Sequence, residues 1–184
     1  MNNDMQQIIV SGLGGQGVLF VTRLLADAAL GMDFSVLISE THGMAQRGGN
    51  VISHLKVAPR GGPRPLVSTL IRPGRADVLL ALHPEAVSVH GYFLSPAGEA
   101  FVNSPGGAGR GHFMDAGAVA SKLGSPVSSN LVLLGFAVGS GKLFCGPEAI
   151  ESVLTGIGGK RLQTSLDAFR AGCAAFSRAD AISG

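Results

Sequence analysis

The stretch Ser11-Gly12-Leu13-Gly14-Gly15-Gln16-Gly17 directly follows the apolar run Ile8-Ile9-Val10. An apolar run, then glycines, then apolar residues at helical spacing predict a strand, a tight turn and a helix. The glycines fit the G-x-G-x-x-G spacing, which lets a ligand approach the backbone and leaves free amides at the start of the helix. A tight turn without a ligand uses the same spacing, so both interpretations stay open.

A second glycine-rich loop, Glu40 to Asn50, follows the apolar run Val36-Leu37-Ile38. In an open α/β sheet, loops at the carboxyl ends of adjacent strands face one crevice, so we expect the two loops to meet. Arg47 offers a planar guanidinium that binds carboxylate or phosphate, and Gly48 and Gly49 let a ligand or another chain come close. Arg47 is our candidate anion contact, and a surface arginine in a glycine turn is the alternative.

Glu40 stands at the end of the predicted second strand. Dinucleotide-binding domains place an acid there to bind a ribose hydroxyl, which suggests a nucleotide-dependent oxidoreductase using Gly12, Gly14, Gly17 and Glu40. The bulky residues that follow Glu40 do not resemble a ribose-binding loop. An ion pair with Arg47, or a helix cap, is the alternative role for Glu40.

Strands and helices alternate along most of the chain. We expect strands at 6–11, 34–39, 51–57, 77–82, 99–103 and 112–115, and helices at 18–30, from 83–85 onward, and at 116–123, 130–138, 147–157 and 161–176. This order predicts an α/β fold: one Rossmann-like domain over residues 1–184, with a mostly parallel sheet and helices on both faces. Residues 58–75, rich in proline and glycine, are expected to form a long irregular loop.

Composition narrows the class of function. Only 14% of the residues are charged and the formal net charge is +2. We interpret the small number of charged residues as a sign of a subunit interface, either with a partner or in a homodimer of the isolated chain. An unusually buried fold is the alternative. The basic residues lack interleaved aromatics, so no nucleic acid is expected. The longest apolar run, Leu131 to Gly139, is too short to cross a bilayer, so we expect a cytoplasmic protein.

The cysteines and histidines give no sign of a metal site. Cys145 and Cys173 are isolated, so the chain cannot hold a four-cysteine iron–sulfur cluster. The five histidines show no spacing that would place two ligands on one helix face. We therefore expect no metal site in this chain.

The two glycine loops together carry a more specific pattern. Gly12-Leu13-Gly14-Gly15-Gln16-Gly17, followed by Glu40-Thr41-His42-Gly43-Met44-Ala45-Gln46-Arg47-Gly48-Gly49, resembles the gamma subunit or domain of the 2-oxoacid:ferredoxin oxidoreductases. The second loop is most similar to that of the beta subunit of indolepyruvate:ferredoxin oxidoreductase. The strand Ala76 to Ala81 and the pair of Asn130 with Leu133-Leu134-Gly135 agree with the family, while Ser165 stands where the family has asparagine.

The resemblance implies that this chain is a non-redox subunit of a multi-subunit enzyme and is inactive alone. The enzyme would oxidatively decarboxylate a 2-oxoacid, an arylpyruvate such as indolepyruvate, to an acyl-CoA. Electrons would pass to ferredoxin. Thiamine diphosphate, magnesium and 4Fe–4S clusters would belong to the large partner subunit, and coenzyme A is a candidate ligand of the crevice. The residues expected to line this crevice are Gly12, Gly14, Gly15, Gln16, Gly17, Glu40, Met44, Arg47, Gly48, Gly49 and Asn130. A free-standing NAD(P)-type oxidoreductase and a regulatory module with an empty crevice are the alternatives.

Overall fold

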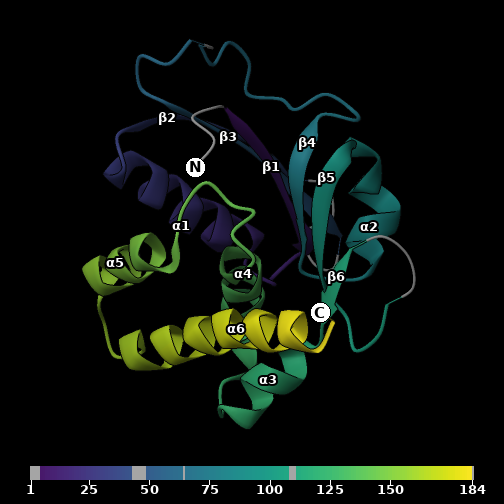
Figure 1. The fold of residues 1–184 in the computed structure, drawn as a ribbon, viewed down its shortest axis with the longest axis vertical. Helices are drawn as coiled ribbons and strands as arrows, with labels where there is room; N and C mark the ends of the chain where they lie inside the picture. The colour runs from purple at the N-terminus through teal and green to yellow at the C-terminus, as the bar shows by residue number, and fades with distance from the viewer. Residues whose placement is uncertain (1–4, 43–48, 64, 108–110, 184) are drawn as a thin grey trace.

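A six-stranded sheet organises the residues that the computed structural model describes, 5–42, 49–63, 65–107 and 111–183 (Figure 1). The strands are β1 (Gln6–Leu13), β2 (Phe34–His42), β3 (Asn50–Pro59), β4 (Ala76–Ala81), β5 (Leu94–Asn103) and β6 (His112–Met114). The helices are α1 (Val18–Gly31), α2 (Glu85–His90), α3 (Ala116–Lys122), α4 (Ser129–Gly139), α5 (Pro147–Ile157) and α6 (Leu162–Ser183), with short 3-10 turns η1 (Gly91–Phe93) and η2 (Pro126–Ser128). The predicted α/β class is confirmed.

The strand order is β2-β3-β1-β4-β5-β6. The pairs β1–β4, β4–β5 and β5–β6 are parallel, whereas β3 runs antiparallel to both β1 and β2. Because β3 opposes both neighbours, β2 points the same way as β1, and the sheet is mostly parallel as predicted. The expectation that the first two strands are adjacent was wrong, because β2 and β3 form an antiparallel hairpin whose second arm lies against β1.

The central strands are buried on both faces. Ile8, Ile9 and Val10 of β1 have no exposed surface, as their unbroken apolar run predicts for a central strand. The alternation along β3 sends His54 and Lys56 to the opposite face from Leu55, yet all three are buried. The long loop after β3 covers that second face, where the Ile71 amide donates to His54 Nδ1 at 3.2 Å. The strand itself runs to Pro59, so the loop begins later than residue 58.

Helices cover both faces of the sheet, but unequally. One core cluster contains residues of α1, α3, α4, α5 and α6 against one face, and a smaller cluster contains Ala86 of α2 with Ile71 and Ile9 on the other. In Figure 1, α1 and α2 lie on opposite sides of the sheet. No helix in the described part of the chain is both long and apolar enough to cross a membrane.

Helix α6 crosses α4 with the two backbones in direct contact, and Figure 1 shows α6 lying across α4. A Cβ placed on Gly135 would overlap the carbonyl of Phe169, and one on Gly172 would overlap the carbonyl of Val132. The two backbones therefore touch through residues that lack side chains. This crossing holds α4, and with it the start of α4 beside β1, in one position.

Candidate functional site

The Gly12–Gly17 turn lies where the chain connections change sides of the sheet. After β1 the chain enters α1 on one face, and after the neighbouring parallel strand β4 it enters α2 on the other. In open α/β sheets the crevice outside the carboxyl ends of two such strands is the usual place for a ligand. The first predicted glycine loop therefore lies at the position where a site is expected.

Gln16 closes this turn from within. The side-chain Oε1 of Gln16 accepts a hydrogen bond from the Leu13 backbone amide at 2.7 Å, and the Gln16 backbone amide donates to the Leu13 carbonyl at 3.1 Å. A Cβ on Gly12 would come within 2.7 Å of Gln16 Oε1 and 2.9 Å of Leu82 Cβ. Gly12 is thus required so that the Gln16 amide can lie over the strand end.

Asn130, at the start of α4, fixes the other end of the turn. Its Nδ2 donates to the Gln16 carbonyl at 3.2 Å, and its Oδ1 accepts the Leu131 amide at 2.8 Å. Gly17 has φ 84° and precedes α1 without a side-chain cap, and a Cβ there would overlap the Asn130 amide nitrogen. The structure brings Asn130 together with Gln16 and Gly17, as the expected site requires.

The two glycine loops meet through one backbone hydrogen bond. The Gly14 amide donates to the Gly49 carbonyl at 2.9 Å, directly beside the Leu13–Asn50 pair that ends the β1–β3 ladder. Gly14 and Gly15 are exposed. Met44, Arg47 and Gly48 lie outside the described residues, so the anion contact expected of Arg47 stays a prediction.

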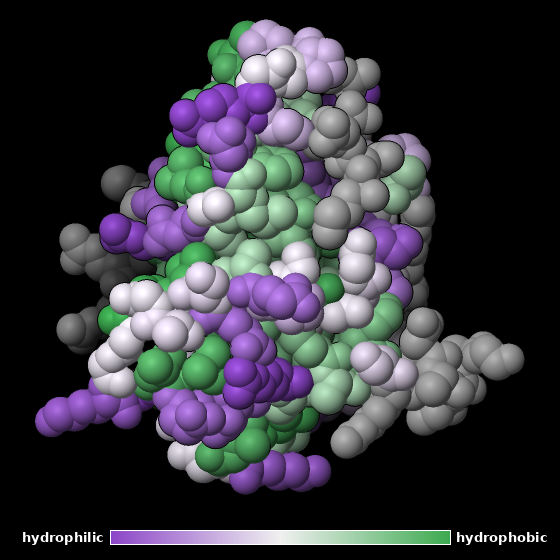
Figure 2. Space-filling view, turned by 60° about the vertical axis from the view of Figure 1, so that its left-hand side comes forward, coloured by the Kyte–Doolittle hydropathy of each residue, from purple (hydrophilic) through white to green (hydrophobic). Residues whose placement is uncertain are grey.

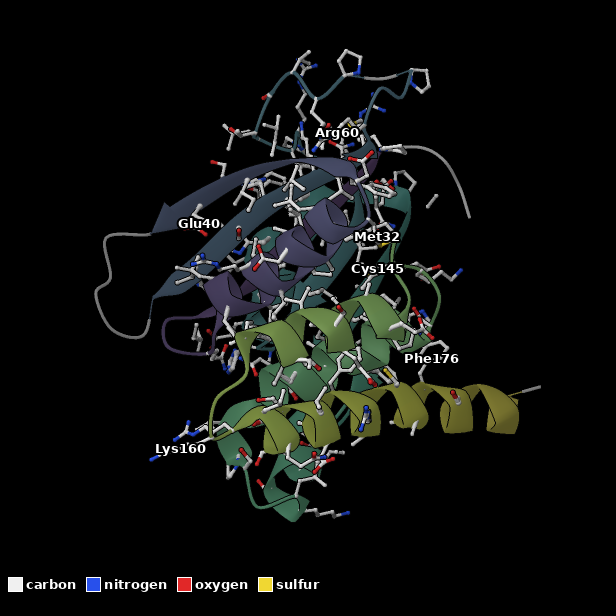
Figure 3. The ribbon with its side chains drawn as sticks, turned by 90° about the vertical axis from the view of Figure 1, so that its left-hand side faces the viewer. Met32, Glu40, Arg60, Cys145, Lys160 and Phe176 are labelled. Atoms are coloured by element: carbon white, nitrogen blue, oxygen red, sulfur yellow. The ribbon has the colours of Figure 1, made fainter. Side chains whose placement is uncertain are left out.

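Glu40 does not join this group. It is exposed on β2, opposite Ser53 of β3, and Ser53 in turn lies opposite Val10 of β1. A whole strand therefore separates Glu40 from β1, and Figure 3 shows it on the outermost strand. The carboxylate faces α1, where it lines a groove with Leu19 and Arg23. This position differs from that of the ribose-binding acid, which needs β2 directly beside β1.

Two histidines that the sequence did not single out lie behind the turn, on the α2 face. Ser11 and His90 share a hydrogen bond of 2.7 Å between Oγ and Nδ1, and the His54 ring packs edge-on against Phe93 at 5.0 Å. Burial lowers the pKa of His90, and burial together with the charges of His90 and Lys56 lowers the pKa of His54. Both rings are therefore neutral near pH 7 and support the strand ends as hydrogen-bonding groups. The alternation that places His54 and Lys56 on one face of β3 was the available signal in the sequence for His54.

The structure also has a hollow away from the glycine turn. A cavity of about 610 Å³ opens at the amino ends of the strands, where Gln6, Asp77 and Glu99 line it. Ligands of open α/β sheets bind at the carboxyl ends, so we place the candidate site at the glycine turn and not at this cavity on the opposite edge.

The cysteines do not fit an iron–sulfur cluster. The chain has two cysteines, and such a cluster needs four thiolates. Burial raises the pKa of the Cys145 thiol to about 12, and burial with the nearby carboxylate of Glu151 raises that of Cys173 to about 11. No group of three or more metal-ligating side chains gathers within the described ranges.

Curated relatives match part of the chain. Indolepyruvate oxidoreductase subunit IorB of Archaeoglobus fulgidus is 41% identical over 88 residues, which are 48% of this chain and 41% of that protein. The subunit of the same name from Thermococcus kodakarensis is 33% identical over 97 residues, 53% of this chain and 46% of that protein. The aligned stretch thus spans less than half the length of these relatives.

Solved structures share the fold. The 2-oxoglutarate:ferredoxin oxidoreductase of Magnetococcus marinus, with 2-oxoglutarate, coenzyme A and succinyl-CoA bound, has a TM-score of 0.79 at 20% identity, over 95% of this chain and 31% of that chain. The gamma subunit of a keto/oxoacid ferredoxin oxidoreductase from Geobacter sulfurreducens has a TM-score of 0.72 at 24% identity, over 96% of this chain and 99% of that one. A family model described as pyruvate ferredoxin/flavodoxin oxidoreductase matches residues 7–175. The chain therefore belongs to the pyruvate ferredoxin/flavodoxin oxidoreductase family.

Proposed function

We propose that this chain, as one domain over residues 1–184, is the non-redox subunit of a 2-oxoacid:ferredoxin oxidoreductase whose substrate is an arylpyruvate such as indolepyruvate. The complex converts the 2-oxoacid and coenzyme A to an acyl-CoA and carbon dioxide, and passes the electrons released to ferredoxin. The similarity to IorB subunits supports the substrate class. The cytoplasmic location expected from the sequence stays part of this proposal.

The observation that carries the proposal is the way three distant segments close the glycine turn. Gln16 caps the turn from within, Asn130 holds it from α4, and Gly49 anchors the second loop to Gly14. The turn is exposed at Gly14 and Gly15, which carry no side chains, so another surface can come into direct contact with its backbone there. In our proposal that surface is the active site of the partner subunit, with an anionic part of coenzyme A or of the 2-oxoacid between them.

Redox chemistry is assigned to the partner. Two cysteines with raised pKa values, Cys145 buried and Cys173 half-buried, are unsuited to hold a cluster, so electron transfer in our proposal runs through the large subunit. That subunit supplies thiamine diphosphate, magnesium and the 4Fe–4S clusters. The role left to this chain is to shape the crevice and to exclude water from it.

Co-expression with a large thiamine- and cluster-containing subunit tests the proposal. The purified complex should oxidise indolepyruvate in a coenzyme A-dependent reaction with ferredoxin as acceptor, whereas the isolated chain should be colourless and inactive. Gly12→Ala, which crowds Gln16, should lower turnover at least tenfold in an assembled complex. The matched control is Gly156→Ala on α5, where a Cβ meets no atom within 4 Å. Turnover by the isolated chain, or a Gly12→Ala complex with full activity, would contradict the proposal.

Nucleotide titration separates this proposal from the NAD(P)-type alternative. Because β3 lies between Glu40 and the glycine turn, we expect no binding of NAD or NADP tighter than roughly 100 μM, which corresponds to about −5.5 kcal/mol. Calorimetry that finds micromolar affinity for either nucleotide would favour the alternative.

A further inference from the structure

The two edges of the sheet differ in how they are protected. β6 ends one side with three residues, a length that offers little template for further pairing. β2 ends the other side with nine residues, FSVLISETH, and pairs only with β3 among the described residues. It contains no proline, lysine or arginine, and its ionisable residues are Glu40 and His42. Apart from Glu40, β2 therefore carries none of the charged residues and prolines that usually keep an edge strand from pairing.

The surface beside this edge is apolar. None of residues 34–40 of β2 is buried, and Ile38 keeps 37% of its surface exposed. Between β2 and α1 runs a groove of about 600 Å³, lined by Leu19, Val36, Ile38 and Leu30, the last of which is 53% exposed. Figure 2 shows the side of the molecule from which α1 faces the viewer, with green residues gathered across its middle. Apolar side chains and unpaired strand backbone thus lie on one continuous face.

The charges on the rim of the groove suit a second copy of the same chain. Arg23 and Asp27 lie one helical turn apart on α1, with 4.0 Å between Nε and Oδ2, and both line the groove. If a two-fold axis passes between these two residues, Arg23 of one copy faces Asp27 of the other. The same symmetry places Asp27 of the first copy opposite Arg23 of the second. Antiparallel pairing of a strand with its own copy obeys the same two-fold symmetry.

From this geometry we propose that β2 is the interface of a homodimer, in which the β2 edges of two chains pair antiparallel and the α1–β2 grooves face each other. The two sheets then continue through the interface and bury both unprotected edges. This interface is separate from the glycine turn and does not depend on the proposed function.

Light scattering of the purified chain gives the first test. The expected mass is twice the 18.7 kDa of one chain at micromolar concentration. Ile38→Lys places a charge in the middle of the edge and should weaken the dimer at least tenfold, with the fold checked by circular dichroism. Val127→Lys is the matched control, because Val127 is 70% exposed but lies in η2, outside the groove. A monomer at all concentrations, or a dimer indifferent to Ile38→Lys, overturns the proposal.

Charge reversal gives a test that depends on the two-fold axis. Arg23→Asp alone and Asp27→Arg alone each place like charges opposite one another, so each variant should dimerise several-fold more weakly. An equimolar mixture of the two should recover a dimer, because every pair across the interface then has opposite charges. A mixture that stays as weak as the separate variants overturns the two-fold arrangement, even if Ile38→Lys fails to fold.

Discussion

Asn130 Nδ2 donates to the carbonyl of Gln16 at 3.2 Å, although the two residues lie 114 positions apart. The contact ties the first turn of α4, in the second half of the chain, to the glycine turn in the first half. It also explains why Gly17 cannot carry a side chain, since the Asn130 amide occupies the space of its Cβ.

Gly17→Ala should destabilise the fold by about 1–2 kcal/mol through its left-handed backbone alone, and by more through overlap with Asn130. Asn130→Ala should cost about 1 kcal/mol for the lost hydrogen bond. The double variant should cost less than the sum, because removal of the Asn130 amide frees space for the new methyl group. Urea denaturation of the four proteins measures this coupling, and strictly additive costs would contradict the steric explanation.

Gly135→Ala should destabilise the protein by about 1–3 kcal/mol or more, because the new Cβ pushes α4 away from the Phe169 carbonyl of α6. Gly156→Ala, in an open position of α5, should be neutral or gain up to about 1 kcal/mol from helix propensity. Thermal melts of both variants provide the comparison. Equal melting temperatures would show that the helix crossing tolerates a side chain.

Stability should fall as the pH drops below 6.5. Burial lowers the pKa values of His54 and His90 from 6.5, so the unfolded chain binds protons that the folded chain excludes. The stability that the neutral rings contribute is therefore complete above pH 6.5 and is lost progressively toward their folded pKa values. His90→Asn, which keeps a polar partner for Ser11, should make the slope shallower in denaturation curves recorded across this range. An unchanged slope would exclude His90 as a source.

Arg47→Lys should be nearly as harmful as Arg47→Ala if Arg47 binds an anionic group of coenzyme A, substrate or partner, because lysine lacks the bidentate fork. The loss should be about 1.5–3 kcal/mol, or roughly ten- to a hundred-fold in rate or affinity. Each variant is assembled with the large subunit, and turnover is compared with a pull-down. A defective pull-down assigns Arg47 to the interface, and a normal pull-down with lost turnover assigns it to the active site. Full activity of the alanine variant removes both roles.

Local patterns predicted most elements because most strands contain an apolar or alternating run and most helices have apolar residues at helical spacing. Residues 147–157 form the predicted helix with the same limits, and Gly17 precedes α1 as expected. β5 begins at Leu94 rather than residue 99, since the pairing of Leu94 with Ala76 extends it through exposed residues that carry no strand pattern. The start of β5 is thus determined by its pairing with β4, which the local sequence does not indicate.

Strand order is where prediction from the sequence failed. The alternation of β3 indicates a strand but says nothing of its neighbours, and only the β2–β3 hairpin reveals that β3 separates Glu40 from the glycine turn. The burial of His54 likewise depends on the long loop after β3, and the path of that loop cannot be predicted from a periodic pattern in the sequence. Asn130 was found through the family resemblance, because a lone asparagine at the start of an apolar helix has no local signal.

The close crossing of α4 and α6 has a consequence for the order of events during protein synthesis. The last long helix of the chain is the one that seats against Gly135, and α4 carries the asparagine that completes the glycine turn. A nascent chain whose α6 has not yet left the ribosome lacks the helix that packs against α4, so the turn should stay incomplete until α6 has emerged. A truncation within α6 should therefore disturb the glycine turn, although the two segments lie far apart in the sequence.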